Sequence, residues 1–434
     1  MLTKRKNLVL IWTVIALTVM GMIFPAQAFA SASNEASWDY GLGSGNALIT
    51  GEDHITHSKA GILYEATTDT VIYAKNADMQ LPPASMTKVM TAILVLEANP
   101  DLEGELTVDD RAVSSMYCGY MVPLKHLNAG EIISYKDCMR YLLVPSGNEA
   151  ATAFAFEIGG DMNTFLDMMN EKAKELGCEN TNFKDPTGLS GNDHYTTPED
   201  MVRICRYAMS FDQFREAVSY PDGQIPPSNV RDEGFTYEST NRVMFPDDRY
   251  ESPYAQYMTG VKTGSTPAAG YCFSGCMEKD GLVFYSVVMG GEELMYKDGE
   301  RIVQGDFLDT IDLYTLTDDL KAQGPGTLPD DTTVTSVLGA GKFDVKLPDS
   351  AKLLVHDGQT VTAEYNIPSA VFGPVKEGDP VGTVTLKAGD EEKTVDLVAA
   401  SSKGVSPVII GGAVVIIAAA AVIILKMRKR KDNV

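Results

Sequence analysis

Residues 82–88 read Pro-Pro-Ala-Ser-Met-Thr-Lys, and an apolar run, Val89–Leu96, follows directly. The two prolines end the preceding element, and helices commonly begin just after such a break. The apolar run predicts a buried helix. Because Ser85 and Lys88 are spaced by about one helical turn, their side chains lie on one face if both belong to the first turn of that helix.

This serine–lysine pair suits nucleophilic catalysis. A serine alone is a poor nucleophile, but a desolvated, neutral lysine beside it can accept its proton. The N-terminal end of a helix also favours negative charge. The same spacing is common by chance, and the competing interpretation is a helix cap followed by a solvated lysine. The rest of the chain must decide between the two.

The chain has 434 residues and a formal net charge of -23. This length allows two or three domains with a sizeable core. Both ends of the chain are basic, so the negative charge lies in the body. An acidic body argues against nucleic acid and anionic lipid headgroups as partners, and favours solubility outside the cell.

Both termini carry membrane-targeting patterns. Lys4–Lys6 is basic, Leu8–Phe24 is apolar and Ala28–Ala30 has small residues at its ends, which together predict a secretory signal peptide rather than an uncleaved anchor. Val408–Leu425 has no charged residue and would span about 27 Å as a helix, close to the thickness of a hydrocarbon core. The basic residues that follow predict a cytoplasmic tail. The sequence therefore predicts a protein of the cell membrane whose body is extracytoplasmic.

The cysteine and histidine patterns predict neither disulfides nor a metal site. Cys272 and Cys276 lie in one expected strand, where about 13 Å separates their α-carbons, too far for a bond. A domain of this size does not need disulfide bonds for stability, so all six cysteines are expected to be buried thiols. His54 and His57 lack further ligands at supportive spacing, and we expect no metal and no cofactor. The six cysteines are Cys118, Cys138, Cys178, Cys205, Cys272 and Cys276.

Hydrophobic periodicity divides the body into two folded parts. The first mixes expected strands with helices, including a hairpin over 60–74, a helix begun by Thr197 and Pro198, and a last helix over 301–320. The second has short Val- and Thr-rich runs and no helical pattern, which predicts a small β domain. The predicted boundaries are 1–30 signal peptide, 31–56 lead-in, 57–322 catalytic domain, 323–331 linker, 332–400 β-rich domain, 401–407 spacer, 408–425 transmembrane helix and 426–434 cytoplasmic tail.

Two further motifs follow the serine–lysine pair in the chain. These are Ser146-Gly147-Asn148 and Lys262-Thr263-Gly264. Either alone is usually a turn or a bend before a strand. In this order, and each in the expected local context, they match the motif set of the penicillin-recognising serine acyl transferases.

The chain resembles the low-molecular-weight penicillin-binding D-Ala-D-Ala carboxypeptidases of serine peptidase family S11. The resemblance covers about residues 57–320, and the β domain is similar as well. It departs at Glu149, where the family often has Asp, and in the apolar C-terminal segment, where many members have an amphipathic helix. It implies an α/β (α+β) fold of the β-lactamase/transpeptidase type, with an antiparallel sheet flanked by helices, a small all-β C-terminal domain and one C-terminal transmembrane helix. The matching stretches are 81–88, 142–150, 165–189, 260–273 and 373–382.

The resemblance also implies the roles of the site residues. Ser85 attacks the carbonyl of the penultimate D-Ala, Lys88 takes the serine proton, and Ser146 passes a proton to the leaving nitrogen. Lys88 can act as a base only if burial and the neighbouring Lys262 keep it neutral. The oxyanion is held by the backbone N–H groups of Ser85 and Ser265. The implied substrate-binding residues are Asn148, Lys262, Thr263, Gly264, Ser265, Arg242 and Arg301, and surface salt bridges are the competing interpretation for the two arginines.

The implied partners are a peptidoglycan stem peptide ending in D-Ala-D-Ala, β-lactams as covalent inhibitors, and the cell membrane through the C-terminal helix. A class A β-lactamase would need a deacylating glutamate, and residues 184–189 contain none. A non-enzymatic wall-binding or sensor module would have lost a motif residue, and none is lost. A DD-endopeptidase uses the same residues, so this alternative stays open.

Overall fold

The structure is a computed structural model that describes residues 48–49, 53–113, 127–189, 193–295, 302–329, 332–337, 341–389 and 391–402. The predicted signal peptide, transmembrane helix and cytoplasmic tail lie outside the described residues, as do Cys118 and Arg301. Within the described ranges, no helix is both long enough and apolar enough to cross a membrane.

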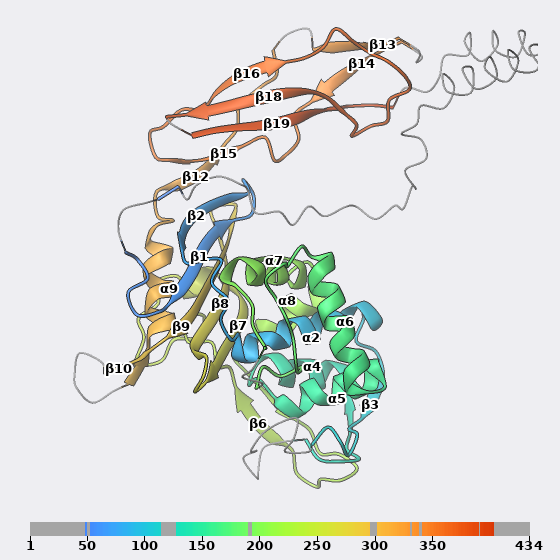
Figure 1. Cartoon of the computed structure of the whole chain (residues 1–434), viewed down its shortest axis with the longest axis vertical. Helices are drawn as coiled ribbons and strands as arrows, with labels where there is room; N and C mark the ends of the chain where they lie inside the picture. The colour runs from blue at the N-terminus through green and yellow to red at the C-terminus, as the bar shows by residue number, and fades with distance from the viewer. Residues whose placement is uncertain are drawn as a thin grey trace, which may run out of the picture. The chain divides into compact units, whose positions relative to one another are not determined.

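A five-stranded sheet forms the frame of the first folded part (Figure 1). Its strand order is β2-β1-β9-β8-β7, and all neighbouring strands are antiparallel. The hairpin predicted over 60–74 is confirmed, and β8 and β9 form a second antiparallel hairpin. The strands are β1 (Ala60–Glu65), β2 (Thr70–Lys75), β7 (Met258–Thr266), β8 (Gly270–Lys279) and β9 (Leu282–Gly291).

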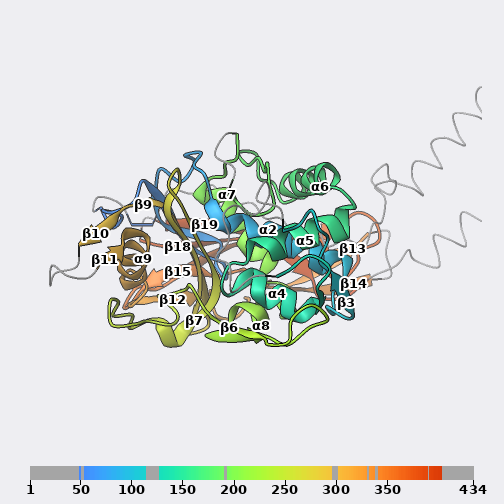
Figure 2. The ribbon, with the colours of Figure 1, turned by 90° about the horizontal axis from the view of Figure 1, so that it is seen from below.

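Helices cover both faces of this sheet (Figures 1 and 2). On one face, α9 (Gly305–Thr315) packs against β8 and β9, with the Phe273 and Phe307 rings 5.4 Å apart in an edge-to-face contact. On the other face, α7 (Pro198–Ala208) packs against β1 and β9. The Thr197 side chain caps α7 at the Asp200 amide, as the sequence predicts.

The centre of the helical part is α2 (Lys88–Ala98), the buried helix predicted from the apolar run. It is apolar on all its faces, and a helix of this kind must be surrounded by other elements. Every residue from Lys88 to Leu96 is buried. The surrounding elements are α4 (Tyr135–Leu143), α5 (Asn148–Gly159), α6 (Met162–Glu175), α7 and α8 (Asp212–Val218). Short two-stranded sheets lie at the margins, β3 (Glu105–Thr107) with β4 (Ile132–Ser134) and β5 (Asp222–Ile225) with β6 (Phe235–Glu238).

The predicted last helix over 301–320 is wrong at both ends. Ile302–Gln304 forms strand β11, which pairs with β10 (Glu293–Met295), in keeping with the strand preference of β-branched Ile and Val. Leu320–Gln323 forms strand β12, which pairs with β15 (Leu353–His356). This second pairing joins segments distant in sequence, so local periodicity could not reveal it.

The second folded part is built of strands, and its described residues contain no helix, in agreement with the predicted β domain. Its six-stranded sheet has the order β16-β18-β19-β14-β13-β17. Its core includes Phe343, Val384 and Leu397. The strands are β13 (Thr333–Ser336), β14 (Gly341–Lys346), β16 (Thr362–Asn366), β17 (Ala370–Val371), β18 (Pro380–Ala388) and β19 (Glu391–Ala399).

The five described cysteines are free and buried, which confirms the prediction of buried thiols for these positions. Cys272 and Cys276 both lie on β8 and do not bond to each other. Burial raises the pKa of each thiol to about 12. These thiols therefore act as small apolar side chains rather than as nucleophiles.

Candidate active site

Ser85 and Lys88 lie at the junction of two helical segments. Ser85 belongs to the 3-10 turn η2 (Ala84–Thr87), and Lys88 is the first residue of α2. The structure places Lys88 Nζ 2.8 Å from Ser85 Oγ. The two side chains thus meet although Ser85 lies in a 3-10 turn before α2 rather than in the first turn of the α-helix. Ala84 has a φ of 49°, an unusual value for a non-glycine residue and one that is concentrated at functional sites.

The environment of Lys88 favours a neutral amine. The side chain is fully buried, and its second hydrogen bond goes to the Thr187 carbonyl oxygen at 2.9 Å. Burial lowers the pKa of Lys88 to about 7, although the Asp185 and Glu149 carboxylates act in the opposite direction. Near neutral pH a substantial fraction of the amine can therefore accept the Ser85 proton.

Lys262 lies on β7 and is also buried. Its pKa is lowered well below the usual value, first by burial and second by the charge of Lys88. The sequence interpretation gave Lys262 a part in neutralising Lys88. Burial is the largest cause of the lowered pKa of both lysines, and repulsion between the two amines adds to it, so charge on one disfavours charge on the other. Lys262 Nζ donates to the Thr263 carbonyl at 3.0 Å, beside the Thr263 hydroxyl at 3.4 Å.

Gly264 allows β7 to approach the nucleophile. A β-carbon at this position would lie 2.6 Å from the Pro83 carbonyl oxygen and 3.1 Å from the Ser85 amide nitrogen. The sequence interpretation assigned this glycine to the approach of the substrate. The contacts show that the protein's own backbone already requires the space. Strand β7 thereby brings Ser265 next to the turn that carries Ser85.

Ser146 and Asn148 come from the connection between α4 and α5. Ser146 adopts a left-handed backbone with φ 71°, and Asn148 is the first residue of α5. The Ser146 hydroxyl oxygen is buried and has no hydrogen-bond partner within the described part of the chain. Ser146 therefore makes no hydrogen bond to Lys88 or Lys262 in this structure. A β-carbon at Gly147 would lie 2.5 Å from the Tyr141 ring, so the loop is tightly packed.

Arg242 follows β6, and its guanidinium lies 3.4 Å from the Asp247 carboxylate and 3.9 Å from that of Glu238. The ion-pair interpretation of this arginine thus has a structural basis, while its role in substrate binding stays a prediction. Thr240, close by in the sequence, places its hydroxyl 2.6 Å from that of Thr263. This contact links the Arg242 loop to the Lys-Thr-Gly motif.

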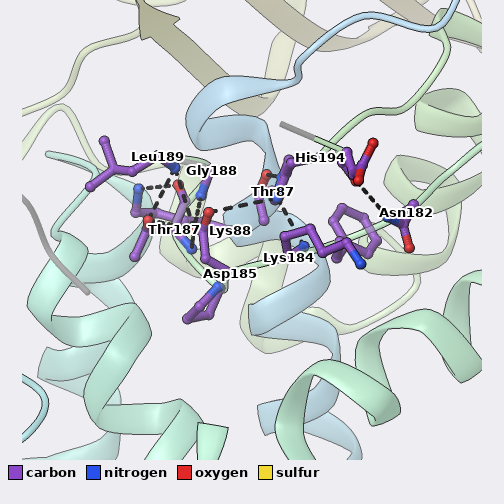
Figure 3. A network of polar contacts seen from close by, with 12 residues as sticks. Thr87, Lys88, Asn182, Lys184, Asp185, Thr187, Gly188, Leu189 and His194 are labelled. Atoms are coloured by element: carbon purple, nitrogen blue, oxygen red, sulfur yellow. Dashed lines mark hydrogen bonds and ion pairs between the residues drawn. The ribbon is translucent and has the colours of Figure 1, made fainter. Parts of the chain in front are cut away.

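The turn that follows Asp185 contributes to the site in a way that the sequence did not predict (Figure 3). Asp185 Oδ1 accepts hydrogen bonds from the Thr187 and Gly188 amides at 2.7 and 2.6 Å, and this turn presents the Thr187 carbonyl to Lys88. Gly188 has a φ of +88°, and a β-carbon there would lie 1.8 Å from the Ala84 carbonyl oxygen. The Asp-Pro-Thr-Gly sequence is a recognisable turn signal, but it does not reveal that the Thr187 carbonyl faces Lys88.

Glu149 is buried, and its charge acts on Lys88. Its carboxylate accepts hydrogen bonds from the Tyr141 hydroxyl at 2.8 Å and the Leu127 amide at 3.1 Å. Within the described ranges, no group of three or more His, Cys, Asp or Glu side chains is arranged to hold a metal ion. The groups described around the site that can take part in chemistry include Lys88 and Lys262, Ser85 and Ser146.

Comparison with known proteins gives consistent matches. The sequence model of the D-alanyl-D-alanine carboxypeptidase family, peptidase S11, matches residues 48–293. The D-alanyl-D-alanine carboxypeptidase DacF of Bacillus subtilis is 28% identical over 352 residues, which cover 79% of this chain and 85% of that protein. A D-alanyl-D-alanine endopeptidase of Escherichia coli is 30% identical over 215 residues, which cover 50% of this chain and 65% of that protein.

A solved structure extends the likeness to the fold. Penicillin-binding protein 5 of Haemophilus influenzae superposes with a TM-score of 0.64 at 20% sequence identity. The superposition covers 82% of this chain and 99% of that one. At this level of identity the likeness concerns the fold alone.

Proposed function

The chain belongs to the D-alanyl-D-alanine carboxypeptidase family, serine peptidase family S11, and on this basis we propose that it removes the terminal D-Ala from peptidoglycan stem peptides. The single observation that carries the mechanism is the buried Lys88 amine, 2.8 Å from the Ser85 hydroxyl oxygen with its pKa lowered to about 7. This pair supplies a nucleophile and its base without a histidine or a metal.

In the acylation step, Ser85 Oγ forms a bond to the carbonyl carbon of the penultimate D-Ala while Lys88 Nζ takes the hydroxyl proton. The negative charge that develops on the carbonyl oxygen is held by the Ser85 and Ser265 backbone N–H groups. The carbon–nitrogen bond then breaks, and the leaving amine takes a proton by way of Ser146. Water next cleaves the acyl-enzyme ester, which frees the shortened peptide and returns the proton to Ser85.

The substrate's terminal carboxylate is held in the second half of β7, at Lys262 and Thr263. Lys262 in its ammonium form, the Thr263 hydroxyl and the nearby Thr240 hydroxyl offer donors to a carboxylate. A bound carboxylate favours the charged form of Lys262, which in turn disfavours protonation of Lys88. Substrate binding thus helps to keep the base neutral. A β-lactam carries a carboxylate in the corresponding place and acylates Ser85 in the same way.

The location of the protein is part of the same proposal. The basic, apolar and small-residue pattern of residues 4–30 supports export, and the apolar segment 408–425 with its basic flank supports a C-terminal anchor. A body outside the membrane would face the cell-wall peptide. Protease treatment of sealed membranes with an exposed outer face would test this topology. The C-terminal tag should be protected from the protease, and the catalytic part should not.

The function is tested with the full-length protein in detergent. We expect release of D-Ala from a peptide ending in D-Ala-D-Ala, and covalent labelling by a fluorescent penicillin at Ser85. Mass spectrometry of the labelled protein locates the adduct, and the Ser85→Ala variant serves as the control. An adduct that persists in this variant, or none in the wild type, contradicts the mechanism. Faster cleavage of a cross-linked stem peptide than release of D-Ala would identify an endopeptidase instead.

A further inference from the structure

His194 is a buried side chain that the mechanism above does not use. It lies next to Thr87, at the junction of η2 and α2 (Figure 3), and its side chain is 0% exposed. Its Nδ1 accepts a hydrogen bond from the Lys184 amide at 3.0 Å. The ring proton therefore belongs on Nε2, which donates to Thr87 Oγ1 at 2.8 Å. Burial lowers the pKa of His194, in keeping with a neutral ring.

The two hydrogen bonds of His194 join segments that are far apart in the sequence. Thr87 lies in η2, directly before Lys88. Lys184 directly precedes Asp185, whose carboxylate organises the turn that carries the Thr187 carbonyl. Backbone hydrogen bonds between Leu81 and Thr196, 2.9 and 3.0 Å long, hold the segment after His194 against the chain before η2. The ring is thus fixed from both sides.

This arrangement determines where the Lys88 amine points. A neutral amine has two N–H groups and one lone pair. One N–H group is held by the Thr187 carbonyl at 2.9 Å, and this contact directs the remaining positions on nitrogen toward Ser85 Oγ. The distance between the Thr187 carbonyl and η2 therefore sets the orientation of the base. A misplacement of about 1 Å at a reacting atom can cost on the order of 100-fold in rate.

We propose that His194 is a positioning residue for acylation, which aligns Lys88 with Ser85 by joining Thr87 to the Lys184–Thr187 segment. The inference rests on the proposed function. His194 itself does not contact the reacting atoms, because its two ring nitrogens bond to Lys184 and Thr87. Asp185 Oδ2 lies 3.6 Å from Nδ1 and is the carboxylate that faces the ring.

Substitutions can remove the two hydrogen bonds of His194, to Lys184 and to Thr87, one at a time. The amide of His194→Asn reaches the position of Nδ1 and keeps an acceptor for Lys184, but it cannot reach Thr87. The longer His194→Gln places its amide near Nε2 and keeps a donor for Thr87. Thr87→Val removes the other partner at nearly constant shape. The acylation rate constant and the noncovalent dissociation constant are measured separately, by stopped-flow reaction of the full-length protein with a chromogenic β-lactam.

We expect His194→Asn and Thr87→Val each to lower the acylation rate constant about 10- to 100-fold, with the noncovalent dissociation constant changed less than about threefold. His194→Gln should retain more of the rate than His194→Asn. The double variant His194→Asn/Thr87→Val should be no slower than the worse single variant, because both remove the same link. The fraction of folded protein in each sample is obtained from the final extent of penicillin labelling.

A matched control separates this role from a loss of stability. Thr152 on α5 is a buried threonine whose hydroxyl bonds to the Ala112 carbonyl at 2.6 Å. Thr152→Val should lower the melting temperature and leave the acylation rate constant unchanged. Wild-type acylation by His194→Asn, or additive effects in the double variant, would overturn the inference while the proposed function stands. A wild-type protein that fails to react with penicillin would instead refute the proposed function.

Discussion

Lys88 Nζ lies 2.8 Å from Ser85 Oγ although the two residues belong to different helical segments, a 3-10 turn and the α-helix that continues it. Because burial lowers the pKa of Lys88 to about 7, the amine is charged below this pH and cannot accept a proton. We therefore expect the second-order rate constant of penicillin acylation to fall about tenfold for each pH unit below 7, and to reach a plateau above it.

The Lys88→Ala variant is the control for this profile. It should remain folded and should show no measurable acylation at any pH between 5 and 9. A rate constant for the wild type that is flat from pH 5 to 8 would exclude Lys88 as the titrating base. Acylation of Lys88→Ala at the wild-type rate would remove this residue from the mechanism.

Gly264 is predicted to be essential for the oxyanion site. A β-carbon there would lie 2.6 Å from the Pro83 carbonyl oxygen, so Gly264→Ala must push β7 away from η2. The proposed oxyanion donors, the Ser85 and Ser265 amides, lie on the two sides of this contact, and their separation would increase. Loss of one such donor costs about 100- to 1,000-fold in rate. We expect a loss of this size in acylation, measured by stopped-flow with a chromogenic β-lactam.

The control for Gly264 is Gly281→Ala in the turn between β8 and β9. Gly281 has a φ of +78° and no atom within 4 Å of the added carbon. This substitution should reduce stability by about 1 kcal/mol through backbone strain alone, without changing acylation. If Gly264→Ala were acylated as fast as Gly281→Ala, the close approach of β7 would be irrelevant to catalysis.

The sequence was most informative where side-chain chemistry follows a fixed motif. The roles of Ser85, Lys88 and Lys262 could be predicted from their residue types. The order of the three motifs predicted that these residues belong to one site. The Thr187 carbonyl that binds Lys88 is a backbone group, and any residue at position 187 would offer it. The residue type at this position therefore does not predict the contact. The sequence around His194 does not distinguish it from an ordinary buried histidine. Its role becomes visible only in the fold, which places Thr87 and Lys184 on either side of its ring.

The same limit explains the errors in the fold. Hydrophobic periodicity identified α2 and the β1–β2 hairpin, because each is determined by local pattern and a local turn. Strand β12 pairs with β15 across a long stretch of chain, so its four residues could not be distinguished from the end of a helix. The burial of Lys88 was inferred from the chemistry it must perform, whereas its cause depends on the packing of helices around α2.

Arg242 provides a test of carboxylate recognition. Its guanidinium is near Asp247 and Glu238 but lies on the loop linked to Thr263 through Thr240. If it holds the substrate carboxylate, Arg242→Ala should raise KM for a D-Ala-D-Ala peptide about 10- to 100-fold, since charge-assisted hydrogen bonds contribute on the order of 1.5–3 kcal/mol. The value of kcat should change little.

Arg249 is the matched control because it is also paired with Asp247, at 2.6 Å. Arg249→Ala removes a comparable ion pair and should leave KM unchanged. Equal effects of the two substitutions would mean that Arg242 acts only through Asp247. No change in KM for Arg242→Ala would support the interpretation of Arg242 as a surface ion pair.

Asp306 predicts a pH dependence of stability that is independent of catalysis. This carboxyl group lies in the first turn of α9, is 1% exposed, and its Oδ1 has no hydrogen-bond partner within the described ranges. Burial raises the pKa of Asp306 to about 7. Backbone hydrogen bonds from Phe307 and from Asp306 itself lower this pKa, but burial has the larger effect. The native state then holds a proton between about pH 4 and 7 that the unfolded chain releases. The free energy of unfolding must therefore fall as pH rises through this window.

Asp306→Asn removes the ionisable group, so the variant should not show this fall in the free energy of unfolding with rising pH. The variant should exceed the wild type in stability at pH 8 by up to about 4 kcal/mol, the value of a pKa shift of about three units, and the advantage should vanish near pH 4. Chemical denaturation from pH 4 to 8 measures it. Asp109, whose pKa is lowered by its hydrogen bond to Arg111, should show the opposite sign, because Asp109→Asn loses stability at pH 7 and recovers it in acid. Parallel profiles for wild type and Asp306→Asn would show that Asp306 is ionised in the native state throughout.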